Sequence, residues 1–492
     1  MTETAKKKRG MPSSFTILLA LLAIVAVITV IVSGTSGGAV TAARLSDFCT
    51  APILGFADAL PVCLFVMILG GFLGMMTETG ALDNGIAVLV QKLKGNEIML
   101  VPVLMLIFSL GGTTYGMCEE TVPFYALLAA TMMAAGFDPM VGAATVLLGA
   151  GCGCLGSTVN PFAVGAAVDA LTGVGIEVNQ SIIIGLGAVL WIVTTAMSIV
   201  FVMNYAKKVK ADKGSTILSM QELKAAEEAH GKAASEVHKE VKLTGRQKGV
   251  LIAFAFTFVV MIVGFIPLAD LNEGVANFFD AGAVYDADGN AVVQGWSALI
   301  TGLPIGQWYF DEASTWFFLM AVLIGIIGGL SEKQIVNTFI TGAADMMSVV
   351  LVIALARGIS VLMANTGLDV YVLDAAANAL AGLSGVIFAP MSFLVYFGLS
   401  FLIPSTSGMA TVSMPIMGPL AVKLGFSPEV MVMIFSAAIG VVNLFTPTSG
   451  AIMGGLALAK IEWTTWLKFA LKLIVALSVV CAIILTVACV ML

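Results

Sequence analysis

Long apolar runs constrain the fold of this chain more than any other feature. Runs at residues 15–32, 249–267, 315–329 and 467–492 are long enough, as helices, to cross a hydrocarbon core about 30 Å thick. Only 11% of residues are charged, against about a quarter in soluble domains. A β-barrel would instead show alternating segments of about ten residues. The sequence therefore predicts an all-α protein that spans a membrane many times, which argues against nucleic acid as a partner.

The distribution of Lys and Arg predicts an orientation, because these residues concentrate in cytoplasmic loops. If the N-terminus is cytoplasmic, only Arg44 and Lys423 lie outside and Arg357 lies within a span. This predicts a bacterial inner-membrane protein with an external C-terminus and an external loop at 268–314. Its first half (1–206) and second half (249–492) are joined by a cytoplasmic linker at 207–248. The mixed charges of the linker indicate a solvated connector.

This orientation requires two apolar stretches to enter and leave the membrane on the same side. One is a hairpin at 97–136 that turns within residues 111–116, and the other is a hairpin at 384–425 that turns within residues 404–408. Irregular backbone at membrane depth is tolerated only where protein buries it or where it lines a wet cavity. Both turns are therefore expected at one cavity.

An internal repeat relates the two halves. Residues 112–123 align with 404–415, so that Thr114 matches Thr406, and farther on Gly151 matches Gly440. Because one hairpin enters from each side, the repeats are inverted, which is characteristic of alternating-access carriers.

After each hairpin comes a helix that a polar, proline-containing segment interrupts, at 138–174 and at 427–459, and a last helix is expected at 463–491. Proline opens a helix by removing a backbone donor. The freed amides suit a carboxylate, and Ser, Thr and Asn oxygens suit a small cation. A simple proline kink explains either break alone, but two breaks in register favour a site. The expected substrate-binding residues are Thr113, Thr114, Tyr115, Glu119, Glu120, Asn160, Ser405, Thr406, Ser407, Thr448 and Ser449, and the expected coupling-ion ligands are Ser157, Thr158, Asn160, Thr446 and Thr448.

Charged residues inside the apolar regions are costly and call for a role. Glu119 and Glu120 could bind an amino group, carry a coupling proton or cap the hairpin backbone. Arg357 could pair with a substrate carboxylate or, as the favoured interpretation, form a structural ion pair with Glu119 or Glu120. Cys152 and Cys154 lack the spacing and histidines of a metal site and are expected to pack.

The 111–121 hairpin, the 156–161 break and the 404–409 turn together resemble the DcuC/YfcC family of the ion transporter superfamily. The resemblance covers nearly the whole chain. It implies a C4-dicarboxylate carrier or a basic amino acid antiporter, built as a homodimer with an elevator-like transport domain. The related divalent-anion carriers use Ser-Asn-Thr signatures at both turns, where this chain has residues 113–115 and 405–407.

The sequence thus predicts a secondary active transporter rather than an enzyme, since no P-loop or nucleophile motif is present. The expected substrate is a small carboxylate-bearing metabolite, and the glutamate pair favours an amino acid, with exchange of basic amino acids of the arginine and ornithine type as one form of this activity. A C4-dicarboxylate carrier coupled to Na⁺ or H⁺ is the alternative, and a passive anion channel is the alternative from another class. No cofactor is expected besides such a coupling ion, and no metal besides Na⁺.

Overall fold

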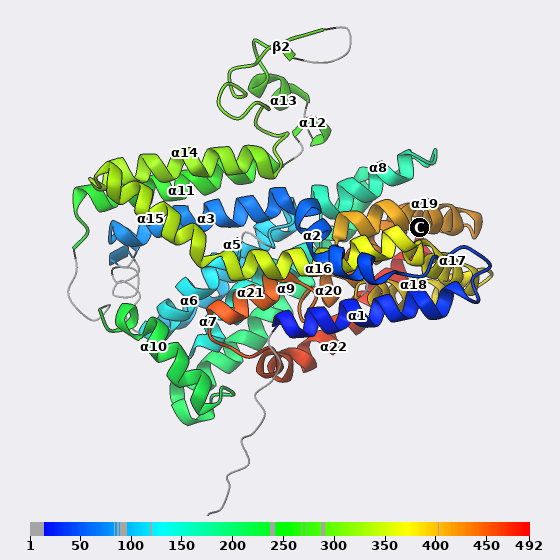
Figure 1. Cartoon of the computed structure of the whole chain (residues 1–492), viewed down its shortest axis with the longest axis horizontal. Helices are drawn as coiled ribbons and strands as arrows, with labels where there is room; N and C mark the ends of the chain where they lie inside the picture. Colours follow the sequence, from blue (N-terminus) through cyan, green and yellow to red (C-terminus); the bar gives the residue numbers. More distant parts are fainter. Residues whose placement is uncertain are drawn as a thin grey trace, which may run out of the picture.

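The computed structural model describes residues 14–82, 84–85, 88, 96–118, 121–236, 242–266, 268–271, 273–286, 291–401 and 403–492. Helices dominate this part of the chain (Figure 1). Eight of the described helices are long and apolar enough to cross a membrane. The chain is therefore a multi-pass membrane protein by the length and composition of its helices.

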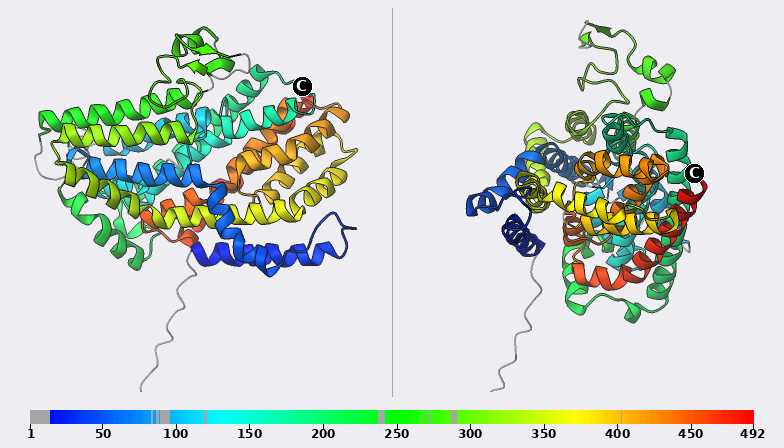
Figure 2. Two further views of the ribbon diagram at one scale, coloured as in Figure 1. Left: turned by 45° about the horizontal axis from the view of Figure 1, so that its top comes forward. Right: turned by 90° about the vertical axis from the view of Figure 1, so that its right-hand side faces the viewer.

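One side of the molecule is built from six helices, called here the front layer (Figures 1 and 2). They are α1 (Ser14–Ser33), α2 (Leu45–Asp58), α3 (Leu60–Glu78), α14 (Phe310–Gly328), α15 (Glu332–Asp345) and α16 (Met347–Thr366). Helix α3 packs on α14 and α15, and α16 packs on α1 and α2. The contacts of the first three helices thus mirror those of the last three. Helix α11 (Gly245–Phe265) packs on α14.

Glycines bring the front-layer helices into backbone contact. A Cβ atom added at Gly70 of α3 would lie 2.5 Å from the carbonyl oxygen of Gly342 in α15, and one at Gly342 would lie 2.4 Å from the oxygen of Gly70. The α2–α16 crossing repeats this arrangement, because a Cβ at Gly55 would lie 2.3 Å from the oxygen of Ala354. Small residues allow this close approach of membrane helices.

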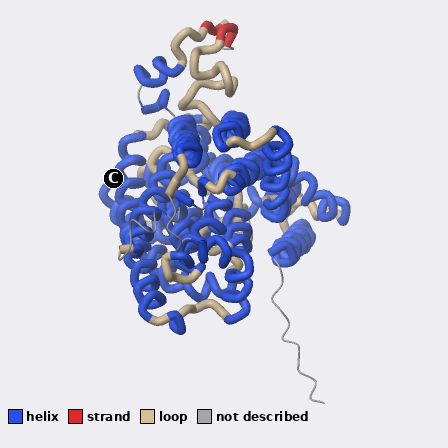
Figure 3. Tube along the Cα trace, turned by 90° about the vertical axis from the view of Figure 1, so that its left-hand side faces the viewer, coloured by secondary structure: helices blue, strands red, loops and turns tan. Residues whose placement is uncertain are grey.

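The remaining helices form the main bundle, seen behind the front layer in Figure 1 and beside it in Figure 3. Its first-half members are α5 (Leu100–Tyr115), α6 (Val122–Ala134), α7 (Pro139–Leu155), α8 (Ala166–Thr172) and α9 (Gln180–Ala211). Its second-half members are α17 (Leu368–Leu380), α18 (Gly385–Leu399), α19 (Thr406–Lys423), α20 (Pro428–Val442), α21 (Gly450–Leu458) and α22 (Trp463–Met491). Helices α7 and α20 are buried almost all round and contact each other, as expected for helices that are apolar on every face.

Contacts in the main bundle also come in pairs. Helix α5 packs on α7 as α18 packs on α20, α7 packs on α9 as α20 packs on α22, and α6 packs on α21 as α19 packs on α8. Each predicted interrupted helix consists of two helices with an irregular segment between them, at residues 156–160 and 443–449. In the first, a π-helical turn (η3, Pro161–Gly165) leads into α8.

The first hairpin turns later than the sequence predicted. We expected the turn within residues 111–116, but α5 stays helical to Tyr115 after a short 3-10 turn (η1, Glu97–Met99). Gly112 serves close packing instead, because a Cβ there would lie 2.2 Å from the carbonyl oxygen of Ala150 in α7. Gly116 ends the helix with a left-handed φ of 81°, a conformation that glycine adopts without strain.

The predicted helical fold is confirmed, and the one sheet in the described chain is small. It lies in the predicted external loop, which also contains α12 (Leu268–Leu271) and α13 (Glu273–Phe279), and it pairs β1 (Val284–Tyr285) with β2 (Ala291–Val293). This segment projects from the helices (Figure 3). The loop ends before the predicted residue 314, because α14 begins at Phe310.

The linker is not a simple solvated connector. Helix α9 runs into it as far as Ala211, a short 3-10 turn follows (η4, Lys213–Ser215), and α10 (Met220–Glu236) packs on α6. Two of its polar side chains are buried against the main bundle. The carboxylate of Glu222 accepts a hydrogen bond from the backbone N–H of Glu462 at 2.9 Å, and Nε2 of His230 lies 3.1 Å from the carbonyl oxygen of Leu458. Buried polar atoms require such partners.

Candidate functional site

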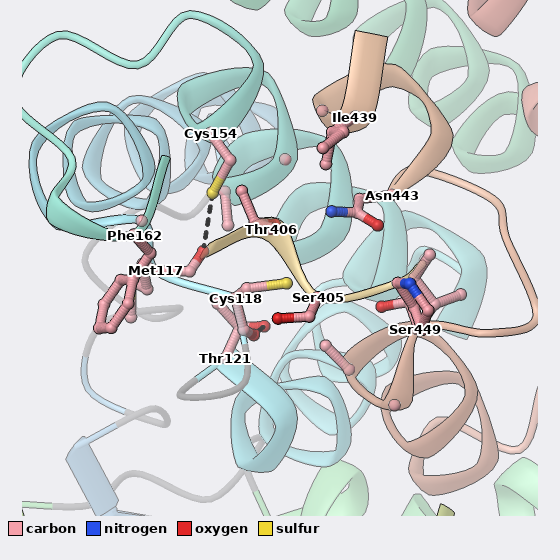
Figure 4. Close-up of a pocket in the computed structure, with 18 of the residues that line it drawn as sticks. Met117, Cys118, Thr121, Cys154, Phe162, Ser405, Thr406, Ile439, Asn443 and Ser449 are labelled. Atoms are coloured by element: carbon pink, nitrogen blue, oxygen red, sulfur yellow. Dashed lines mark hydrogen bonds between the residues drawn. The ribbon is translucent and has the colours of Figure 1, made fainter. Parts of the chain in front are cut away.

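A cavity of about 140 Å³ lies where the two hairpin turns and the two helix breaks meet (Figure 4). The main bundle supplies most of its wall, and the front layer contributes through α3, α14 and α16. A single water molecule needs about 10–15 Å³ of such cavity volume, so the cavity suits a small metabolite rather than a single ion.

Residues 289 positions apart line the cavity in pairs. Gly151 and Gly440 line it from the C-terminal parts of α7 and α20, and Cys154 and Asn443 line it from the ends of the same helices. Leu147 pairs in the same way with Ser436. The cavity thus has two walls of corresponding position, called here the α7 wall and the α20 wall, which differ in polarity.

The first break is joined to the first hairpin by hydrogen bonds. The hydroxyl of Thr113 donates to the carbonyl oxygen of Gly156 at 2.6 Å. The carbonyl oxygen of Thr113 accepts from both the backbone N–H and the hydroxyl of Thr158, at 2.9 and 3.0 Å. These bonds satisfy backbone groups that the helix break would otherwise leave unpaired.

Asn160 caps the helical segment after the first break. Its Oδ1 accepts from the backbone N–H groups of Phe162 and Ala163 at 2.9 and 3.3 Å. Its Nδ2 donates to the hydroxyl of Ser157 at 2.9 Å, and that hydroxyl donates to the carbonyl oxygen of Cys154. The polar groups of this break are therefore largely engaged within the protein.

The second hairpin leaves more polar groups available. Ser405 caps α19 by accepting from the N–H of Gly408 at 3.1 Å, so the N-terminus of α19 points toward the cavity that Ser405 lines (Figure 4). The side chains of Thr406 and Ser407 also line the cavity, and neither makes a hydrogen bond with the described part of the chain. In the second break, the hydroxyls of Thr446 and Thr448 lie 2.7 Å apart.

Arg357 of α16 is the one charged side chain among the described residues that line the cavity. Its Nε lies 3.5 Å from Oδ2 of Asp58, which the sequence had not suggested as a partner. Asp58 is half exposed, and an ion pair in that setting is weak. The guanidinium therefore retains N–H groups for a carboxylate, which it can bind in bidentate fashion.

The structure brings some of the predicted residues together and places others outside the cavity. Those that line it are Asn160, Ser405, Thr406, Ser407, Thr448, Ser449 and Arg357. Thr113, Thr114, Ser157, Thr158 and Thr446 do not line it, and the hydroxyl of Thr114 bonds back to Leu110 in α5. Glu119, Glu120 and the side chain of Tyr115 lie outside the described residues.

Sequence reasoning missed Ser436 and Asn443 of the α20 wall. After Glu429, Ser436 is the one polar side chain in α20, and Asn443 follows it by seven residues. Residues seven apart lie on one face of a helix, so their spacing was a usable signal. The hydroxyl of Ser436 is buried without a hydrogen-bond partner among the described residues.

A second cavity, of about 550 Å³, lies farther along the same helices. It is lined by α3 and α15 of the front layer, by α6 and α21, and by His230 of α10. Its acidic side chains are Glu78 and Asp345. An apolar cluster reaches both cavities, because its residues Ile353 and Ala451 line the first and its Met346 lines the second. This cluster, called here the apolar plug, comprises Ala59, Cys63, Val66, Val122, Met346, Val349, Val350, Ile353 and Ala451.

Membrane-spanning helices, paired helix breaks and a small polar cavity between them define a membrane transporter rather than an enzyme. The comparison with protein families agrees, because the family model described as DcuC, C4-dicarboxylate anaerobic carrier, matches residues 38–490. The chain belongs to this family.

Two relatives cover most of the chain. An uncharacterized protein of Haemophilus influenzae is 29% identical over 443 residues, which is 90% of this chain and 78% of that protein. The "Putative basic amino acid antiporter YfcC" of Escherichia coli is 27% identical over 440 residues, which is 87% of this chain and 77% of the relative.

Two solved structures resemble the fold at low sequence identity. The YdaH transporter of Alcanivorax borkumensis is 15% identical with a TM-score of 0.46, over 97% of this chain and 98% of that one. MtrF of Neisseria gonorrhoeae is 17% identical with a TM-score of 0.43, over 97% of this chain and 95% of that one.

Proposed function

We propose that the protein is a secondary active transporter of an amino acid, with basic amino acids of the arginine and ornithine type as its foremost substrates. The observation that supports this most is the convergence of both hairpin turns and both helix breaks on one cavity that contains Arg357. The name of the Escherichia coli relative, a basic amino acid antiporter, supports the same class.

The charges around the cavity suit a zwitterion. Arg357 and the N-terminus of α19 provide positive charge for a carboxylate. The C-terminal ends of α7 and α20 also reach the cavity, through Cys154 and Asn443, and carry partial negative charge. An amino acid presents both charges that this arrangement would bind.

A C4-dicarboxylate is the second candidate, supported by the description of the family. Such a substrate has two carboxylates, whereas the described lining offers one cationic side chain. The amino termini of α19 and α21 would have to hold the second carboxylate.

Alternating access follows if the halves are inverted repeats, which the mirrored helix contacts and the paired cavity residues support. We propose that the main bundle moves relative to the front layer in elevator fashion, within a homodimer in a bacterial inner membrane with the N-terminus cytoplasmic. In this arrangement the apolar plug is the barrier between the substrate cavity and the acidic second cavity. If the substrate cavity opens toward the second cavity, the plug residues of α3 and α16 must separate from those of α6 and α21.

The coupling ion is proposed to be Na⁺ or H⁺. In the first break, a Na⁺ ion would compete with the hydrogen bonds of Ser157 and Thr158. In the second, the adjacent hydroxyls of Thr446 and Thr448 offer two oxygens close together.

Counterflow in proteoliposomes tests the proposal. Vesicles that contain the purified protein are loaded with unlabelled arginine, and uptake of labelled arginine is followed with and without Na⁺, against succinate-loaded vesicles and protein-free vesicles. Accumulation driven by internal arginine is expected. Counterflow of labelled succinate in succinate-loaded vesicles, without counterflow of arginine, would favour the dicarboxylate carrier, and equilibration without counterflow would favour the passive channel.

Thermal unfolding of the purified protein provides an independent readout, because a ligand that binds the native state raises its apparent stability. Arginine and ornithine at saturating concentration are expected to raise the melting temperature, and a stabilisation by dicarboxylates alone would contradict the amino acid proposal.

A further inference from the structure

The two walls of the substrate cavity occupy corresponding positions but differ in chemistry. In the α7 wall the positions are held by Leu147 and Cys154, and in the α20 wall by Ser436 and Asn443. Polar groups for a ligand therefore come from one wall. A site with this asymmetry holds an unsymmetrical substrate in one orientation.

Ser436 is one of five buried helical hydroxyls in the described chain that have no hydrogen-bond partner, and of these five it alone lines the cavity. Serine and threonine in apolar helices normally bond back to a carbonyl one turn earlier, as Thr145 does to Val141 at 2.7 Å and Ser400 does to Tyr396 at 2.6 Å. The Ser436 hydroxyl does not, although only 2% of the residue is exposed. A buried hydroxyl without a partner is costly, and this one lies at the cavity wall.

Asn443 is the second free polar group of this wall. Its backbone N–H ends α20 by bonding to Ile439 at 2.8 Å, while its side-chain amide makes no hydrogen bond with the described residues and is seen at the cavity (Figure 4). Asn443 stands at the C-terminus of a 15-residue helix. The partial negative charge of that terminus favours a cationic group and disfavours a carboxylate.

We infer that Ser436 and Asn443 form a subsite that accepts hydrogen bonds from the side-chain amino or guanidino group of the substrate. Their side-chain oxygens, Oγ and Oδ1, are the acceptors. This inference rests on the proposed function, and it makes these two residues determinants of the preference for basic over aliphatic amino acids.

The test compares competition by arginine and by norvaline, a neutral amino acid with an unbranched aliphatic side chain, in the uptake assay. Ser436→Ala and Asn443→Leu remove the acceptors with little change in volume. In the double variant the preference for arginine over norvaline is expected to fall at least about tenfold, because hydrogen bonds to charged groups carry differences of this size. An unchanged preference, or an equal loss for both ligands, would overturn the inference.

Ser392→Ala is the matched control. Ser392 of α18 is also a fully buried serine whose hydroxyl has no partner in the described chain, but it does not line the cavity. Its substitution should leave the preference unchanged. If Ser392→Ala lowered the preference for arginine over norvaline as much as Ser436→Ala does, loss of any buried hydroxyl would have this effect. That result would overturn the inference.

Thermal unfolding checks that the variants fold. Ser436→Ala removes an unpaired buried hydroxyl, so its melting temperature without ligand should equal or exceed that of the wild type. The outcomes separate the two proposals. A wild type that binds succinate and no amino acid refutes both the proposed function and the subsite, whereas an arginine-binding wild type whose preference survives the double substitution refutes the subsite alone.

Discussion

The first and second hairpin-and-break units use similar residues for different purposes. In the first, Thr113, Thr158 and Asn160 bond to one another's backbone or cap a helix, so their polar groups hold the unit together. In the second, Thr406 and Asn443 face the cavity without partners in the described chain. The comparison indicates that the polar groups of the first unit stabilise the protein, whereas those of the second unit remain available to bind the ligand. Four predictions test or sharpen this division.

The largest effect is expected from Gly112→Ala in the first unit. The added methyl would lie 2.2 Å from the carbonyl oxygen of Ala150 and 2.8 Å from the backbone nitrogen of Cys154. Backbone atoms cannot move aside locally, so we expect destabilisation by about 3 kcal/mol or more. Fluorescence-detected size exclusion should show little folded protein. Gly408→Ala is the matched change in the second unit, and there the nearest atom is the movable Oγ of Ser405. A well-folded Gly112→Ala protein would contradict the supporting role of the first hairpin.

Arg357→Gln should weaken binding of any carboxylate substrate about 100-fold, since it removes a charge-assisted hydrogen-bonding group from the cavity. Arg357→Lys should recover part of the affinity, because it restores the charge without the planar fork. Affinity is measured by ligand-induced thermal stabilisation. Asp58→Asn removes only the partner of Arg357 and should change affinity little. Equal losses in Asp58→Asn and Arg357→Gln would show instead that the ion pair has a structural role.

A pair of threonine substitutions separates support from binding. Thr113→Val removes the hydroxyl that donates to Gly156 and should cost about 1–2 kcal/mol of stability through the unpaired carbonyl. Thr406→Val removes a hydroxyl without a partner in the described chain, so stability should change by less than about 0.5 kcal/mol. Affinity for the substrate should respond in the opposite order. The division between the two units fails if Thr406→Val alters stability and not affinity.

The smallest effect concerns His230 of α10. Burial lowers the pKa of this histidine below its usual value of 6.5, and Lys460 lowers it further. Because the native state then binds fewer protons than the unfolded state, the contribution of His230 to stability is complete above pH 6.5 and declines as the pH falls through its native pKa. Glu78 and Asp345 line the same cavity and limit the effect.

Hydrogen exchange of α10, corrected for intrinsic rates, measures this contribution at pH 7.5 and at pH 5.5. The wild type should lose protection at the lower pH by more than His230→Gln, whose side chain does not titrate. Identical losses in the two proteins would assign the pH response to other groups.

The fold could be predicted to the extent that local chemistry decides it. Long apolar runs indicated spans, and prolines at 161 and 447 marked where two helices are interrupted. The roles of individual glycines were harder to predict. Gly112 allows close helix packing and Gly116 forms the turn, and only tertiary contacts distinguish these roles. The burial of α10 depends on Glu222 and His230 meeting residues more than two hundred positions away, which composition cannot reveal.

The site was predicted in part for the same reason. Hydroxyls and amides near the breaks were identifiable by type, but whether each faces the cavity or bonds within the protein depends on the neighbouring helix. Thr113 and Thr406 illustrate this, since only the first meets a free carbonyl. Ser436 and Asn443 were overlooked because they lie within or at the end of an apolar helix rather than in a polar motif.

The glycine contacts of the front layer have a mechanical consequence. Where α3 meets α15, Gly70 and Gly342 touch through backbone atoms, and Thr341 and Ala343 flank Gly342 along its helix. Sliding α15 by one residue would place a side chain where even a methyl does not fit. The α2–α16 crossing is locked in the same manner by Gly55 and Gly358. These backbone contacts oppose sliding within the front layer, so the movement proposed above would have to take place between the front layer and the main bundle.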